Sequence, residues 1–193
     1  SATGGPSTGS TAPCACSAIL ENRATNPKSA MVATPYPIPQ LLTLLAAAPS
    51  HIVAATADLN ATQLRAAPAP EQWSANDVLA HLRACADVWG GCIATILAQD
   101  EPTFRAVNPR TWMAQTDYLD LEFKSSLDAF TTQRAALLGV LEPLPPTAWS
   151  RGATVKGAGK TLRRTVFSYA DWLASHERPH LKQIASVAAM MRA

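Results

Sequence analysis

Apolar residues recur at helical spacing along most of the chain after its first forty residues. The first such pattern covers about residues 39–64, and Pro49-Ser50 divides it into a short and a longer piece, so we expect the helix to break there. A second pattern starts at Ser74, where Ser74-Ala75-Asn76-Asp77 is typical of a helix start with an acid in the first turn. Its predicted inner face consists of Val78, Leu82, Cys85, Trp89, Ile93 and Ile96.

Two more helices are predicted in the C-terminal half. The third covers about residues 111–142 and ends at "EPLPPTAW", and the fourth runs from about Thr161 to Met190 after a Gly-rich stretch. The third helix has an apolar stripe formed by Phe123, Leu127, Phe130, Leu137 and Leu141. Strand signals are few. Four long amphipathic helices predict an all-α protein, a four-helix bundle.

The fourth predicted helix carries two histidines where core residues are expected. Its apolar stripe is Leu162, Val166, Tyr169, Leu173, Ile184, Val187 and Met191. Steps of three and four residues from Leu173 lead through His176 and His180 to Ile184. The two histidines therefore lie one turn apart on the inner face, where they could bind one ion.

A third histidine is predicted to face the same interior. His81 lies three residues after Val78 and four before Cys85, on the inner side of the second helix. Burying an imidazole without a partner costs about 1–3 kcal/mol, whereas a divalent ion would satisfy three at once. We therefore predict a metal site formed by His81, His176 and His180, with hydrogen-bonded core histidines as the alternative. His51 is expected to be a surface or ordinary core residue.

The segment His176–His180 also matches H-E-x-x-H, the pattern of zinc proteases. Such a protease needs a ligand downstream, but no His, Asp or Glu follows His180, so this function is disfavoured. Pro179 is expected to kink the helix. Glu177 is about 100° round the helix from His176, so we expect it at the surface or in contact with a ligand rather than as a peptidase base.

Several neighbouring residues have two interpretations. Cys85 lies one turn beyond His81 and could be a fourth ligand, although a small core residue is the favoured interpretation. A pocket lining or plain core packing is expected for Trp89, Tyr169, Trp172 and Arg134. Gly157–Thr161 resembles a phosphate-binding loop, but Thr154 stands where its first glycine belongs, so we expect a turn and a helix start.

Composition narrows the classes of function. The net charge is +2 and the basic residues are scattered, which disfavours nucleic acid as a partner. The apolar run 41–48 is too short to span a membrane. Cys85 and Cys92 would lie roughly 10 Å apart on one helix and cannot form a disulfide, so the cytoplasm is the expected compartment. Residues 1–36, which include Cys14 and Cys16, are expected to be a flexible lead-in to one domain, 37–193.

Two motifs resemble those of the DinB/YfiT-like superfamily of metalloenzymes. They are "EQWSANDVLAHL" at 71–82 and "HERPHLKQI" at 176–184, and the resemblance covers roughly 39–190. It implies a four-helix bundle whose central divalent ion is held by His81, His176 and His180. The ion would be Zn, Ni, Fe or Mn, with Zn or Ni favoured.

The resemblance also implies a function. The chain would be a bacterial, cytoplasmic metal-dependent enzyme, with a homodimer as its expected assembly. Its substrate would be a small molecule, with low-molecular-weight thiols as candidates, and its reaction a thiol S-transfer or a hydrolysis. The alternative is a non-catalytic binding or stress-response bundle whose metal is structural or absent.

Overall fold

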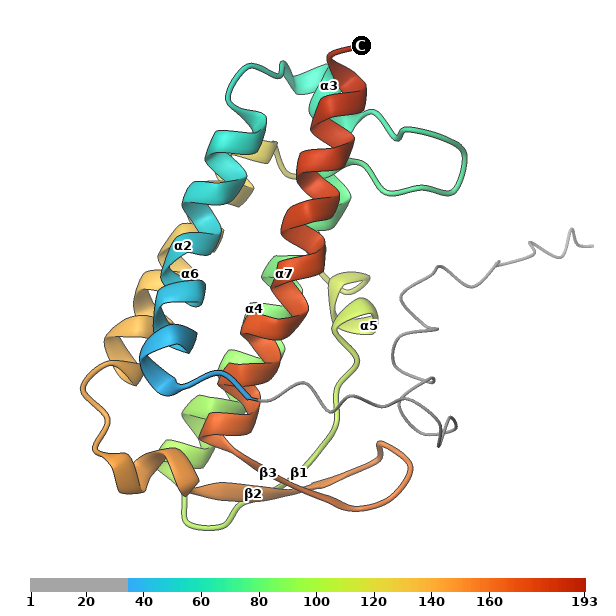
Figure 1. The fold of residues 1–193 in the computed structure, drawn as a ribbon. Helices are drawn as coiled ribbons and strands as arrows, with labels where there is room; N and C mark the ends of the chain where they lie inside the picture. The colour runs from blue at the N-terminus through green and yellow to red at the C-terminus, as the bar shows by residue number, and fades with distance from the viewer. Residues whose placement is uncertain (1–34) are drawn as a thin grey trace, which may run out of the picture. The chain divides into compact units, whose positions relative to one another are not determined.

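The computed structural model describes residues 35–193, and Pro35–Ala193 form one compact unit. Four long helices lie side by side along this unit (Figure 1). They are α2 (Ile38–Thr56), α4 (Ala75–Ala98), α6 (Phe123–Leu141) and α7 (Val166–Met191). Two short helices, α3 (Ala61–Arg65) and α5 (Pro109–Met113), connect them. The predicted four-helix bundle is thus confirmed, while Cys14 and Cys16 lie outside the described residues.

Helix α4 starts where the sequence predicts. The Ser74 hydroxyl accepts a hydrogen bond from the Asp77 backbone N–H, and the Asp77 carboxylate accepts one from the Ser74 N–H at 2.9 Å. These reciprocal bonds satisfy two of the N–H groups that a helix start leaves unpaired. All six residues of the predicted inner face are buried. The phase of α4, which determines where His81 points, was therefore predicted correctly.

Helix α2 shows that the predicted break at Pro49 is wrong. The helix is continuous from Ile38 to Thr56 with Pro49 inside it. Pro49 removes one backbone hydrogen bond, but the helix also buries Leu41, Leu45 and Ile52 completely. Burying these side chains stabilises the helix by more than the lost bond costs.

Helix α2 is also long and apolar enough to cross a membrane, judged by length and composition alone. The buried side chains of α2 pack in the core of the bundle, against residues of α4, α6 and α7. A core helix of a soluble protein passes the same test, so this property is weak evidence for a membrane span.

Two other predicted helix boundaries are corrected. The expected helix over 111–142 is divided into α5 and α6, and residues 114–122 between them form turns. Helix α7 begins at Val166 rather than Thr161, because Thr165 caps it by accepting a hydrogen bond from the Ser168 N–H. The helix then continues through Pro179 to Met191.

A small sheet at one end of the bundle was not predicted (Figure 1). Strand β1 (Thr103–Arg105) pairs in parallel with β2 (Gly152–Lys156), and β2 pairs antiparallel with β3 (Leu162–Thr165). The Gly-Lys-Thr segment is the turn between β2 and β3, where Gly157 and Gly159 adopt φ of 85° and 81°. Because β3 follows this turn, the segment does not open a helix as expected, and it lacks the context of a phosphate-binding loop.

The apolar core has two large clusters, and Ala80, Ala84 and Met113 form a third, small one. One large cluster lies toward the sheet and includes Trp89 and Leu173, whereas the other includes Leu79, Phe130 and Ile184. Along α4 the change from one cluster to the other occurs between Leu82 and Cys85, just after His81. Along α6 and α7 it occurs around Arg134 and His176–His180, respectively. The bundle therefore contains a polar layer between two apolar halves.

Candidate metal centre

Three histidine side chains meet between α4 and α7. The Nε2 atoms of His81 and His176 are 3.0 Å apart. The ring centroid of His180 lies 4.9 Å from that of His81 and 4.7 Å from that of His176. His81 and His180 are buried and His176 is half-buried. The structure thus brings together the three residues that the sequence selected, whereas His51 is exposed on α2.

The spacing of the imidazoles suits a small divalent ion. Two nitrogens bound to a tetrahedral zinc at about 2.0–2.1 Å are themselves about 3.3 Å apart. The 3.0 Å separation of His81 Nε2 and His176 Nε2 is close to that distance. Two neutral imidazoles in this position can share one proton as a hydrogen bond, or both can direct a lone pair at a cation.

Gln183 orients the third imidazole. Its side-chain oxygen lies 3.0 Å from His180 Nδ1, so Nδ1 carries the proton and donates it. The other nitrogen, Nε2, then has the lone pair that a metal ligand needs. Gln183 belongs to the motif that carries the family resemblance, but the sequence reasoning gave it no role. Its position three residues after His180, on the same helix face, was the available signal.

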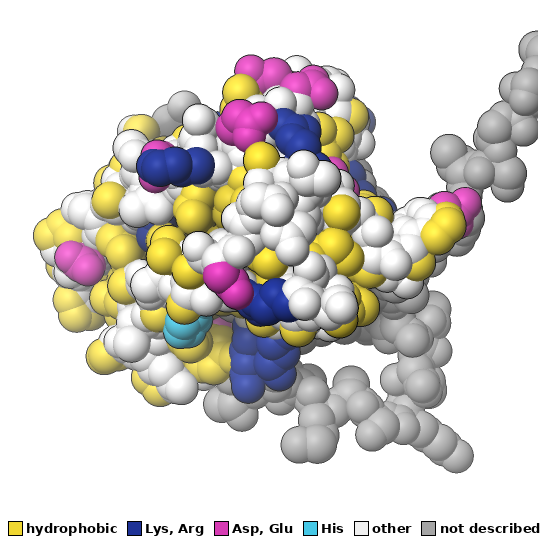
Figure 2. Space-filling model, turned by 90° about the horizontal axis from the view of Figure 1, so that it is seen from above, with side chains coloured by type: hydrophobic (Ala, Val, Ile, Leu, Met, Phe, Trp, Pro, Cys, Tyr) yellow, Lys and Arg dark blue, Asp and Glu magenta, His cyan; other side chains and the backbone are white. Residues whose placement is uncertain are grey.

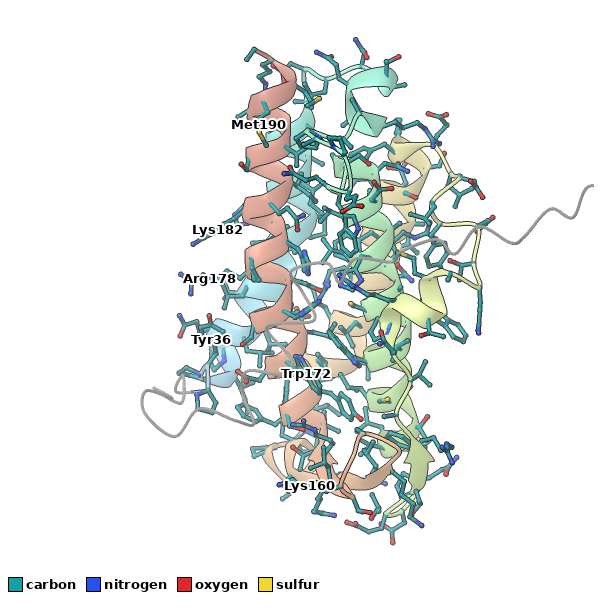
Figure 3. All side chains as sticks on the ribbon, turned by 90° about the vertical axis from the view of Figure 1, so that its right-hand side faces the viewer. Tyr36, Lys160, Trp172, Arg178, Lys182 and Met190 are labelled. Carbon is teal, nitrogen blue, oxygen red and sulfur yellow. The ribbon has the colours of Figure 1, made fainter. Side chains whose placement is uncertain are left out.

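Aromatic rings pack around the imidazoles. Trp73 lies 5.2 Å from His81 and stacks with His180 at 6.2 Å, measured between ring centroids. Trp89 lies edge-on to His176 at 5.0 Å and stacks on Trp172 at 4.9 Å. Trp172 is labelled on α7 in Figure 3. These contacts restrict the rotation of the imidazoles and exclude water from part of the layer.

Burial keeps the imidazoles neutral. Loss of hydration, with a smaller contribution from neighbouring charged groups, lowers the pKa of His81 to about 3 and that of His176 to about 4. Burial also lowers the pKa of His180. At neutral pH these groups therefore need not release a proton before they bind a cation, which removes one cost of metal binding.

The Cys85 thiol lies beside the same group. Its sulfur is 3.5 Å from His81 Nε2, close to the roughly 3.6 Å expected between a nitrogen and a sulfur on one tetrahedral zinc. The ligand atoms of His81, Cys85 and His176 all lie within 4.8 Å of one another. Cys85 is fully buried, as expected of a core cysteine, and is also within reach of the candidate site.

Glu177 is not a surface residue, which corrects one of its two expected placements. It is 2% exposed, and its carboxylate accepts a hydrogen bond from Arg134 Nη2 of α6. Burial raises the pKa of Glu177, and the Arg134 guanidinium opposes that shift. Glu177 Oε2 and Arg134 Nε and Nη1 have no hydrogen-bond partner within the described residues. The next residue along α7, Arg178, extends outward from the bundle (Figure 3).

Two hollows adjoin the bundle helices, and neither includes a histidine of the cluster. One of about 240 Å³ lies between α2 and α7 and is lined in part by His51 and Glu177. The other, of about 330 Å³, lies between α4 and α6 and is lined in part by Arg134. The sequence left two interpretations, pocket lining or core packing, for Trp89, Tyr169, Trp172 and Arg134. Arg134 lines one of these hollows, and Trp89 and Tyr169 are core residues.

Acidic, basic and apolar side chains are interspersed on the end of the molecule shown in Figure 2. The view shows no continuous basic area on that face. The mixed surface agrees with the scattered basic residues in the sequence.

Comparison with known proteins identifies the family. The model of the DinB superfamily matches residues 44–184, more than half of the chain. The fold is similar to that of YfiT from Bacillus subtilis, described as a probable metal-dependent hydrolase with an unusual four-helix bundle topology. That similarity has a TM-score of 0.69 at 16% sequence identity and covers 89% of this chain and 97% of YfiT.

No curated protein matches the chain by sequence. The identity to YfiT is low enough that this likeness supports the fold alone. The match of the family model, together with the bundle, is sufficient for one conclusion: the chain belongs to the DinB superfamily.

Proposed function

We propose that this protein binds one divalent metal ion through His81, His176 and His180 and is a metal-dependent enzyme acting on a small molecule. The observation that carries the proposal is the meeting of three imidazoles from two helices. Zn or Ni is favoured over Fe and Mn as the ion. The reaction would be a hydrolysis, as in the description of YfiT, or a transfer to a low-molecular-weight thiol.

The residues of the site have separate roles in this proposal. A bound divalent ion with an open coordination position supplies Lewis-acid activation of water or of a thiol. Gln183 fixes the tautomer of His180, and Trp73 and Trp89 restrict the imidazole rings. The partner would be a small molecule rather than nucleic acid or a membrane, and a cytoplasmic homodimer remains the expected form.

Metal content tests the proposal. Protein purified without a His-tag or chelator should contain about one equivalent of a divalent metal, or take it up on reconstitution. His81→Ala and His180→Ala should each lose it, because the two ligands come from different helices and share one ion. His51→Ala is the matched control and should retain the metal, since His51 is exposed on α2. Wild-type protein that takes up no metal would contradict the proposal.

A second candidate is a non-catalytic bundle with a structural ion, in which Cys85 fills the fourth coordination position. The observation that favours it is the 3.5 Å separation of Cys85 Sγ and His81 Nε2. A closed set of four protein ligands is typical of structural rather than catalytic zinc sites. In this candidate the protein would serve as a binding or stress-response module.

Cobalt substitution separates the two candidates. The Co(II) form should show a thiolate-to-metal charge-transfer band if Cys85 is a ligand, and Cys85→Ser should remove that band. Cys92→Ser is the control, because Cys92 is not in the group of close ligand atoms. A Co(II) spectrum without the band, unchanged in Cys85→Ser, would favour the three-histidine enzyme.

A further inference from the structure

We propose that Arg110 recognises an anionic group of the ligand at the metal centre, so that the ligand is a small molecule bearing a carboxylate or similar oxyanion. This inference rests on the proposed function and deepens it by naming a class of substrate. Four observations support it. They are the anchoring of α5 beside His81, the position of the Arg110 guanidinium, its unused hydrogen-bonding capacity, and the charge of the site.

Helix α5 is anchored beside His81. Met113 of α5 packs in one apolar cluster with Ala80 and Ala84, which flank His81 along α4. The Trp112 indole donates a hydrogen bond to the Asp87 carboxylate of α4 at 3.2 Å. The backbone that carries Arg110 is therefore held against the turn of α4 that supplies the first histidine.

The Arg110 guanidinium lies over a ring that contacts the site. Its central carbon is 4.9 Å from the centroid of Trp73, which in turn contacts His81 and His180. Arg110 is half-buried, so a ligand from solvent can reach it.

Arg110 has unused hydrogen-bonding capacity. Its Nη2 is buried without a hydrogen-bond partner among the residues that the structure describes. None of the ion pairs within 35–193 includes Arg110. A buried donor on a charged group costs free energy until an acceptor binds it. The planar guanidinium matches the two oxygens of a carboxylate.

The charge of the site also favours an anion. Three neutral imidazoles contribute no negative charge, so a divalent ion and the guanidinium would repel each other at short range. An oxyanion that binds near both cations relieves this repulsion and satisfies Nη2. A neutral ligand of the same shape does neither.

Benzoate and its neutral analogue benzamide are suitable probes. Titration calorimetry on the zinc-reconstituted protein should detect benzoate and show much weaker binding of benzamide. Arg110→Gln should weaken benzoate binding by about tenfold or more, as loss of a charge-assisted hydrogen bond predicts. Arg110→Lys should recover part of the affinity, which a purely structural role of Arg110 would not explain.

The control variant is Arg105→Gln, which removes the same charge from an exposed position in β1 and should bind benzoate like wild type. Equal benzoate affinity in wild type and Arg110→Gln overturns the inference, and so does equal affinity for benzoate and benzamide. If wild type takes up no zinc, the proposed function fails and the same titration is made on metal-free protein. Benzoate binding to metal-free protein that Arg110→Gln weakens would support anion recognition without the metal. Absence of benzoate binding to metal-free protein would overturn the inference.

Discussion

Each histidine of the polar layer is costly to bury, but it can also serve as a metal ligand. Buried in a bundle, an imidazole remains neutral, because desolvation penalises its charged form. His81 and His180 show this most clearly, since both are buried and both have a lowered pKa. The same neutrality that makes them acceptable in the core makes them ready ligands. Arg110 differs, because it is a cation and forms no ion pair in the described part of the chain.

The lowered pKa values predict that metal-free protein loses stability in acid. An unfolded histidine has a pKa of about 6.5, above the values of about 3 and about 4 in the folded protein. The unfolded state therefore binds more protons below pH 6.5, so stability is full above that pH and falls as the pH decreases. At pH 5 each buried histidine would cost at most about 2 kcal/mol.

Urea unfolding of metal-free protein at pH 7 and pH 5 measures this loss. His81→Gln should reduce the difference between the two free energies of unfolding, while the exposed His51→Gln should leave it unchanged. A free energy that does not change between these pH values would contradict the assignment of neutral buried imidazoles.

At the scale of elements, helices α6 and α7 are joined through the layer by Arg134 and Glu177. The pair is buried, and a second oxygen of Glu177 and two nitrogens of Arg134 have no partner within 35–193. Desolvation of two charges offsets much of their attraction, so the intact pair adds little net stability. Removal of one partner has a larger effect, because the charge left alone in the core is costly.

Arg134→Met should therefore lower the free energy of unfolding by about 3–5 kcal/mol, since it leaves the Glu177 carboxylate buried without its cation. The double variant Arg134→Met/Glu177→Met should lose less than Arg134→Met alone. Chemical denaturation of the single and double variants makes the comparison. A double variant that is less stable than either single variant would show that the pair contributes net stability.

At the scale of the whole molecule, the two large apolar clusters meet at a layer in which imidazoles of α4 and α7 contact each other. A metal bound there would connect residues nearly a hundred positions apart in the sequence. An ion that binds the folded state alone stabilises that state in proportion to its occupancy. Metal binding should then stabilise the whole bundle against unfolding, rather than one helix alone.

Zinc at a hundred times its dissociation constant should raise the free energy of unfolding by about 2.7 kcal/mol. For a protein of this size, that corresponds to a rise in melting temperature of about 5–10 °C. Differential scanning calorimetry with zinc and then with EDTA measures the rise and its reversal. His81→Ala should show no rise and His51→Ala the full rise. A wild-type melting temperature that is insensitive to both additives would contradict a shared ion.

The sequence alone determined the bundle and the direction in which the histidines point. Local signals were sufficient for this, because the spacing of apolar residues sets the phase of a helix and the Ser74 cap sets its start. The inner face of α4, and the positions of His81, His176 and His180 relative to it, could all be read from the order of residues.

Only the tertiary structure decided features that depend on distant neighbours. Pro49 remains helical because its helix is buried, and the strand β2 forms because β1 and β3 lie on either side of it. Glu177 is buried because α6 supplies Arg134, and Arg110 lies over Trp73 because α5 packs on α4. No local pattern encodes these outcomes, since each is set by which element packs against another.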